Sequence, residues 1–142
     1  MAEPTEHQIQ TLMSLPADAP LGVLNLFQFR GTARYAPEDP EFGTLEAEVS
    51  GATAFERYGE VAGTFIARCG GRVVFSTAVA QVMIGDEQIE WDIAALMFFP
   101  RRADFSNMLA DPEFAAVSRH RKAALANHYM LHLAGDPFDL KK

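Results

Sequence analysis

The chain contains four short apolar segments but only two long amphipathic helices. The apolar segments are Leu21–Phe29, Val73–Ile84, Ile93–Phe99 and Tyr129–Leu133. Two helices can cover one face of a four-stranded sheet, yet several of these segments are apolar on both faces. The second face must therefore meet something, and the sequence has no further element large enough to cover it. A second copy of the same sheet is the simplest partner, so the sequence predicts a homodimeric barrel.

Length and charge narrow the class of protein. The 142 residues predict a single domain, 1–142, large enough for a hydrophobic core. The net charge of −7 argues against a nucleic-acid partner or an anionic membrane surface, which require a basic face. A single cysteine, Cys69, allows no internal disulfide. Without a signal peptide or a membrane span in the sequence, we expect a cytoplasmic protein.

The N-terminal region, residues 1–20, is predicted to be a helical extension. Thr5 and Gln8 have the spacing of a capping box, and Pro16 marks a stop. The segment Leu21–Phe29 follows, with Val23, Phe27 and Phe29 on one side and Leu24 and Leu26 on the other. Apolar residues on both faces are typical of a central, doubly buried strand.

Residues 31–49 differ from their surroundings in composition. Prolines and glycines break any periodicity, and five carboxylates make the stretch acidic. A connection of this length is unusual inside a compact domain and is commonly a lid, a binding loop or a flexible segment. The pattern favours a solvated acidic insertion loop, with a lid as the alternative.

The first long helix is predicted over Thr53–Cys69, with a capping box at Thr53 and Glu56 and a stop at Gly70. An extended segment then runs to Ile84 and turns at Gly85 into a strand over Trp91–Phe99, which together predict a hairpin.

The second long helix is predicted from Asp111 to about Ala126, because Asp111 can cap it and Pro112 suits its first position. A short helical turn precedes it, a last strand follows it, and residues 135–142 form a polar tail. The element order is helix, then β-α-β-β-α-β. This order predicts an α+β, ferredoxin-like fold: a four-stranded antiparallel sheet with its helices on one face.

Several stretches, in this order and spacing, resemble one protein family. They are Leu24-Asn25-Leu26-Phe27-Gln28-Phe29-Arg30, Gly51-Ala-Thr-Ala-Phe-Glu-Arg-Tyr58, Ala67-Arg68-Cys69-Gly70-Gly71, Gly85-Asp86, Trp91-Asp92, Asp111-Pro112-Glu113-Phe114, His120-Arg121 and Ala124-Leu125. Together they resemble the domain of unknown function 1330, a bacterial family of dimeric α/β-barrel proteins, over about residues 5–134. The resemblance implies the ferredoxin-like fold and dimerisation, and it implies no activity.

Arg121 is the first candidate for a ligand-binding residue. It interrupts the apolar stripe formed on its helix by Phe114, Val117 and Leu125. A buried guanidinium requires a partner, so Arg121 either reaches water or meets an acid or an anionic ligand. Asp92, on a strand face with apolar neighbours, is either an exposed strand end or the acid that pairs with Arg121.

Tyr58 and Asn25 are the other two candidates for ligand contacts. Tyr58 lies on the inward stripe of the first helix, where its hydroxyl needs a partner. Asn25 shares the strand face of Val23 and Phe27, so its buried amide either bonds within the protein or contacts a ligand.

Metal and thiol chemistry find little support in the sequence. His128 and His132 share a strand face but lie about 13 Å apart at the rise of a strand, too far to bind one ion. No zinc or EF-hand motif is present, and we expect no metal and no cofactor. Cys69 ends an apolar helix stripe and is interpreted as an inert buried thiol.

The favoured function is the binding of a small apolar or acidic organic metabolite in a cavity of the dimeric barrel. Catalysis without a cofactor stays open, since similar folds host oxygenases and isomerases. In that case His120, with a pKa near neutrality, and Asp92 are the candidate catalytic groups.

Two alternatives remain. The first is a non-catalytic binding or interaction module whose main surface is its own dimer interface. The second is a haem-degrading barrel enzyme, in which Asn25, Trp91 and His120 would take the places of the Asn, Trp and His of that family.

Overall fold

The computed structural model describes residues 3–135. The polar tail predicted over 135–142 lies outside the described residues except for its first position. The helices and strands are α1 (Glu6–Ser14), β1 (Leu21–Phe29), the 3-10 turn η1 (Leu45–Ala47), α2 (Gly51–Arg68), β2 (Arg72–Ala78), β3 (Ile93–Phe99), α3 (Arg102–Ala110), α4 (Pro112–Ala124) and β4 (Leu125–Leu133).

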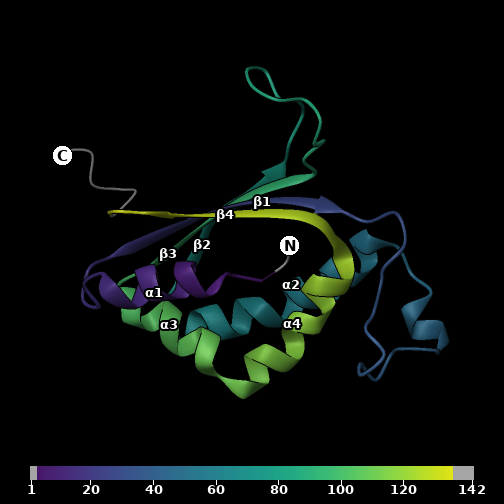
Figure 1. Ribbon diagram of the computed structural model, residues 1–142, viewed down its shortest axis with the longest axis horizontal. Helices are drawn as coiled ribbons and strands as arrows, with labels where there is room; N and C mark the ends of the chain where they lie inside the picture. The colour runs from purple at the N-terminus through teal and green to yellow at the C-terminus, as the bar shows by residue number, and fades with distance from the viewer. Residues whose placement is uncertain (1–2, 136–142) are drawn as a thin grey trace.

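The four strands form one antiparallel sheet in the order β2-β3-β1-β4. Helices α2, α3 and α4 lie together below the sheet, and α1 lies on the same side (Figure 1). This arrangement is the ferredoxin-like α+β fold predicted from the element order. The central position predicted for β1 is confirmed, since it pairs with both β3 and β4.

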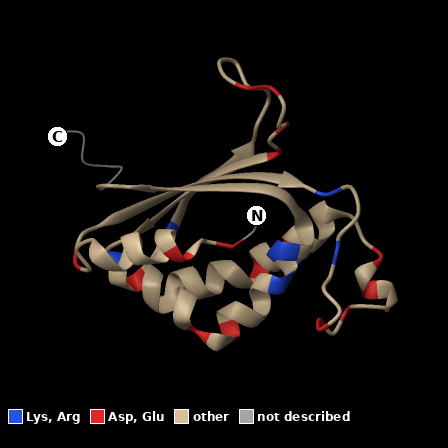
Figure 2. Cartoon of the chain, in the orientation of Figure 1, with Lys and Arg blue, Asp and Glu red and all other residues tan. Residues whose placement is uncertain are grey.

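The strands carry almost no charge, because β1, β3 and β4 contain no Asp, Glu, Lys or Arg (Figure 2). The core between the sheet and the helices holds two clusters of buried apolar side chains. One surrounds Leu21, Val23 and Phe99, and the other surrounds Phe27 and the loop residue Tyr35. None of the helices among residues 3–135 combines the length and the apolar character needed to cross a membrane.

The helix ends follow the expected chemistry except at the start of α2. Thr5 and Gln8 form the predicted capping box of α1, and Asp111 caps α4 with Pro112 at its first position. The cap predicted at Thr53 is wrong, because the Ser50 hydroxyl accepts the N–H of Thr53 and α2 begins at Gly51.

Glycine is required at position 51. Its N–H donates to the carbonyl oxygen of Arg30, and a Cβ at this position would collide with the carbonyl oxygens of Arg30 and Ala124. The start of α2 is therefore set by contacts with the end of β1 and the end of α4, which a local capping pattern does not reveal.

The extended segment predicted to reach Ile84 is wrong, since β2 ends at Ala78 and β3 begins at Ile93. At this end of the sheet the carbonyl oxygen of Asp92 accepts the N–H of Val79. Asp92 also bonds to β1, donating its N–H to Phe27 O and accepting the N–H of Phe29 with its side chain. The connection between β2 and β3, residues 79–92, rises from the side of the sheet opposite the helices (Figure 1).

The last strand begins earlier than predicted. Helix α4 ends at Ala124 and β4 starts at once with Leu125, so Asn127 lies inside the strand. Its amide Nδ2 donates to Gln28 Oε1 at 2.7 Å, which satisfies a polar side chain within the sheet.

Candidate functional site

The candidate site is a line of polar side chains between the sheet and the helices, formed by Asn25, Tyr58, Arg121 and His128. We call these four residues the Arg121 cluster. Asn25 is its innermost member, only 1% exposed, on the helix-facing side of β1. Its Oδ1 lies 2.9 Å from His128 Nε2, and its Nδ2 lies 4.0 Å from Met97 Sδ. Both the oxygen and the nitrogen of the Asn25 amide thus have partners inside the protein.

His128 links Asn25 to Arg121. Its Nδ1 lies 3.4 Å from Arg121 Nη1. A guanidinium can only donate, so Nδ1 accepts and the ring proton of the neutral imidazole resides on Nε2, which donates to Asn25. Burial first, and then the positive charge of Arg121, lower the pKa of His128 to about 4. His128 is therefore neutral at pH 7.

Tyr58, on α2, completes the cluster from the helix side. Burial raises the pKa of its phenol, while the charge of Arg121 and hydrogen bonding between the two side chains act in the opposite direction. The ring of Tyr58 packs near Phe55 and Phe114, with centroids 5.8 Å and 6.3 Å away. The polar cluster therefore borders an aromatic wall.

A carboxylate of the same chain faces Arg121 from the outside. Glu3 Oε1 lies 3.8 Å from Arg121 Nη2 and 2.5 Å from Lys122 Nζ. The Arg121 side chain is 13% exposed, whereas about half of the Glu3 side chain is open to solvent. The N-terminal segment before α1 thus places an acid at the accessible end of a largely buried guanidinium.

His120 lies in a second group of contacts, away from the Arg121 cluster. Its Nδ1 is 2.7 Å from the hydroxyl of Tyr35, which also accepts a hydrogen bond from Arg57 Nη1 at 3.0 Å. The Tyr35 hydroxyl thus joins Arg57 on α2 to His120 on α4. Burial is the main cause that lowers the pKa of His120. Tyr35 and Arg57 were not among the predicted site residues.

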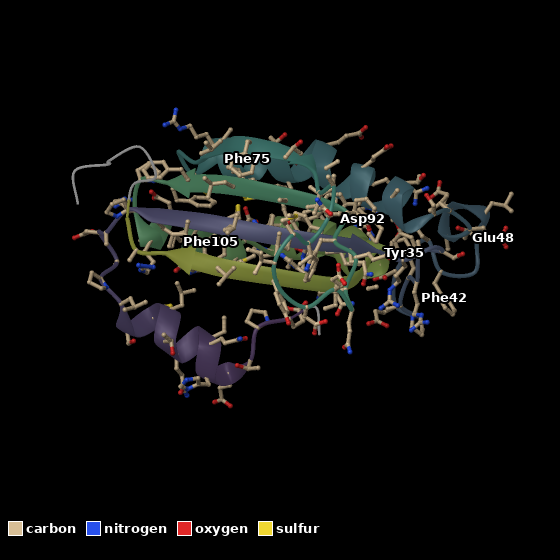
Figure 3. The ribbon with its side chains drawn as sticks, turned by 90° about the horizontal axis from the view of Figure 1, so that it is seen from above. Tyr35, Phe42, Glu48, Phe75, Asp92 and Phe105 are labelled. Carbon is tan, nitrogen blue, oxygen red and sulfur yellow. The ribbon has the colours of Figure 1, made fainter. Side chains whose placement is uncertain are left out.

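The acidic insertion loop is docked by these contacts. Glu41 is 6% exposed and receives two hydrogen bonds of 2.9 Å from Arg119 on α4. The Arg119 hydrogen bond lowers the pKa of Glu41 to about 2. Figure 3 places Tyr35 beyond one end of the sheet, with Phe42 and Glu48 farther out on the loop. The expectation of a solvated insertion is thus wrong for the part of the loop that carries Tyr35 and Glu41.

Asp92 holds the sheet together rather than pairing across the core. Its Oδ2 accepts the backbone N–H of Phe29 at 2.8 Å at the end of the β1–β3 ladder. The side chain is exposed there, which agrees with the strand-end interpretation and not with a partnership to Arg121.

The remaining predicted residues have separate surroundings. The ring of Trp91 packs on Tyr129, with centroids 5.1 Å apart, whereas Asn25 and His120 bond to His128 and Tyr35. The contacts of these three residues give no support to a haem-degrading site. Burial, followed by Asp104 and Asp111, raises the pKa of Cys69, which disfavours the thiolate.

Across residues 3–135, no three His, Cys, Asp or Glu side chains come together as a metal site would require. The functional candidate that sequence reasoning missed is His128. Its distance from His132 argues against a shared metal ion, but its position opposite Phe27 places it on the same sheet face as Asn25.

Comparison with known proteins agrees with the fold. Two crystal structures of RPA0582, a protein of unknown function from Rhodopseudomonas palustris, are similar to this chain at 27% identity. The first covers 95% of this chain and 96% of its own, with a TM-score of 0.82. The structure of the methylated protein covers 97% of each chain, with a TM-score of 0.84.

No curated protein matches the chain. The family model for a domain of unknown function, DUF1330, matches residues 42–133, which include α2, α4 and three of the four strands. These residues are well over half of the sequence and contain Tyr58, Arg121 and His128. The chain therefore belongs to the DUF1330 family.

Proposed function

We propose that the protein binds a small organic acid at the Arg121 cluster, with Arg121 holding the carboxylate of the ligand. The observation that carries this proposal is the contact between a largely buried guanidinium and the carboxylate of Glu3. Glu3 belongs to the N-terminal segment and is half exposed, so its carboxylate can be exchanged for that of a ligand. In this interpretation the Glu3 oxygen occupies the place of a ligand oxygen.

The surroundings of Arg121 define the ligand class. A planar guanidinium suits a carboxylate because both groups form paired hydrogen bonds. His128 and Tyr58 place further polar atoms beside it, while Phe55 and Phe114 provide an apolar wall. We therefore infer a ligand with one carboxylate and an apolar, preferably aromatic, body.

His128 and Tyr58 are the side chains that would transfer a proton to such a ligand. These are the groups in the cluster that exchange protons, whereas His120 and Asp92 are bonded to Tyr35 and to the backbone of Phe29. His128 is neutral at pH 7, and its unprotonated ring nitrogen accepts from Arg121, so it is a weak base that takes a proton only after the ligand displaces this contact. Proton transfer by these two side chains requires no cofactor.

The test is a binding screen with aromatic and aliphatic monocarboxylic acids, each paired with its neutral amide. We expect the acids to raise the melting temperature and the amides to have no effect. Arg121→Met should lower the affinity more than tenfold, about 1.4 kcal/mol, and Arg121→Lys should restore little. Glu3→Gln should raise the affinity, because it removes the competing carboxylate.

Arg68→Met serves as the matched control, since Arg68 is an exposed arginine of α2. It should leave the affinity unchanged. Unchanged affinity in Arg121→Met, together with a loss of several kcal/mol of stability, would show that Arg121 is a structural residue and would refute the proposal.

We also propose that the protein is a homodimer built on the face of the sheet opposite the helices. The register places these apolar side chains on that face: Leu24, Leu26, Phe75, Leu96, Tyr129 and Leu131. We call this set the uncovered sheet face. Leu131 and Tyr129 remain at least half exposed in the single chain. A contiguous apolar patch of this kind is typical of an interface.

Phe27 and Met97 do not belong to this face. Phe27 is buried against α2, and Met97 pairs with Val23 on the helix-facing side, next to the core. Trp91 remains a candidate, because its ring packs on Tyr129 of the uncovered sheet face.

A further inference from the structure

Arg102, at the start of α3, is a buried cation with unsatisfied hydrogen-bond donors. It is 6% exposed, and its Nε and Nη1 atoms have no hydrogen-bond partner in the structure. It takes part in none of the ion pairs found among residues 3–135. Its backbone N–H is satisfied by Ala19 O at 2.7 Å, so the unsatisfied donors are the two side-chain nitrogens Nε and Nη1.

This situation is unfavourable for a protein that binds nothing there. Buried charges are normally paired, since moving a charge out of water is costly without a partner of opposite sign. Arg121 illustrates the usual outcome, with Glu3 and His128 beside its guanidinium.

His132, whose pKa the charge of Arg102 affects, does not supply the missing negative charge. Burial, followed by the charge of Arg102, lowers the pKa of His132, so this imidazole is neutral at pH 7. Its ring packs perpendicular to Phe105, with centroids 4.8 Å apart. Figure 3 shows Phe105 toward the end of the sheet opposite Tyr35, so this region is distinct from the docked acidic loop.

Arg102 also lines a small pocket between α1 and α3. The pocket has a volume of about 140 Å³. The α1 side and the residues after it provide apolar walls, Leu12, Leu15 and Ala17, and the α3 side provides Ser106 and Asn107 beside Arg102. The volume corresponds to roughly five water molecules, enough for an anion of a few heavy atoms.

We propose that this pocket is a second ligand site, which binds a short-chain carboxylate with Arg102 as its counter-ion. The carboxylate would accept from Arg102 and from the polar side chains of α3, and the short alkyl chain would contact the leucines of the α1 side. None of the four residues of the Arg121 cluster lines the Arg102 pocket, so the two sites are separate.

The experiment uses the full chain and propionate as the probe, with propionamide as the neutral isostere and chloride at the same ionic strength. Binding is measured by calorimetry, and the pKa of His132 is followed by NMR. We expect propionate to bind and to raise the pKa of His132, because an anion beside Arg102 offsets its charge. Propionamide and chloride should do neither.

Two variants test the assignment to this pocket. Arg102→Met should abolish the effect of propionate on the pKa of His132 without loss of stability, since it removes an unpaired buried charge and leaves any binding at the Arg121 cluster in place. Ala103→Leu keeps the arginine and fills the pocket, and it should lower the affinity more than tenfold. Arg121→Met should leave propionate binding at this pocket intact, which separates failure here from failure of the proposed function.

Three results would overturn the proposal. The first is a pKa of His132 that does not respond to propionate in the wild-type chain, which would mean that water satisfies Arg102. The second is a chloride effect equal to that of propionate, which would refute a carboxylate site. The third is unchanged propionate affinity in Ala103→Leu, which decides the matter even if Arg102→Met does not fold.

Discussion

Individual polar side chains on apolar faces are the features that give this protein its chemical character. Asn25 and His128 stand on adjacent strands of the helix-facing side, and Arg121 reaches them from α4. Their bonds form a continuous line, in which each group satisfies the next. A buried polar network of this kind is stable only while every member keeps its partner, so single substitutions should have clear effects.

His128 should make the stability of the protein decrease in acid. Its pKa is about 4 in the folded chain and 6.5 in the unfolded chain. Between these values the unfolded state takes up a proton that the folded state refuses, so stability falls as the pH decreases through this interval. We expect a loss of about 1–2 kcal/mol between pH 8 and pH 5 from this residue.

His128→Gln should reduce the pH dependence of the free energy of unfolding above pH 5, measured by urea denaturation, while His120 and His132, whose pKa values burial also lowers, keep their own contributions. The exposed His7→Gln on α1 is the control and should keep the wild-type slope. Glu41 does not interfere, because its contribution is lost only between pH 4.5 and about 2. Equal slopes in wild type and His128→Gln would contradict the assignment.

At the scale of elements, the acidic loop between β1 and α2 is the segment whose behaviour differs most from its composition. It is rich in carboxylates, yet Tyr35 packs in the core and Glu41 bonds Arg119 on α4. Arg57 adds a third attachment, because its Nη1 donates a hydrogen bond of 2.8 Å to the carbonyl oxygen of Glu46. The loop is therefore attached to α4 by half-buried polar contacts and to α2 by one half-buried and one exposed hydrogen bond from Arg57.

Glu41→Gln should release this loop. Removing one partner of a partly buried ion pair leaves Arg119 uncompensated, and we expect a loss of about 1–3 kcal/mol. Hydrogen exchange should accelerate at the amides of residues 39–48. Glu48→Gln, at an exposed position farther out on the loop (Figure 3), should leave both quantities unchanged. Identical behaviour of the two variants would show that the Arg119 pair does not hold the loop.

At the scale of the whole molecule, one face of the sheet is covered by helices and the other is not. The uncovered sheet face is uncharged along β1, β3 and β4 (Figure 2). The 79–92 connection rises on the same side and exposes Met83 and Ile84. A second copy covering this side would explain both features, because it would remove the apolar surface from contact with water, which is favourable.

We expect light scattering to give a mass twice that of the 15.6 kDa chain at micromolar concentration. A stable interface should bury more than about 1,000 Å² in total. Leu131→Glu places a charge on the uncovered sheet face and should dissociate the dimer. Leu45→Glu, at an exposed position in the acidic loop, should not. A mass of 15.6 kDa for the wild-type chain would rule out the dimer.

The sequence by itself determined the element order and much of the local structure. The alternation along Leu21–Phe29 and the caps at Thr5 and Asp111 depend on neighbours in the chain, so they could be predicted. The same periodicity placed Asn25, Tyr58 and Arg121 on inward faces, and the structure brings these three together. Such patterns are readable because burial of apolar surface drives them.

Only the tertiary structure decided the features that depend on distant residues. The start of α2 depends on Arg30 and Ala124, and the residue before β3, Asp92, is tied to Phe27 and Phe29 of β1. The partners of His120 and His128 likewise come from other elements. A hydrogen bond between side chains far apart in sequence leaves no local pattern, because its geometry exists only after the helices have packed on the sheet.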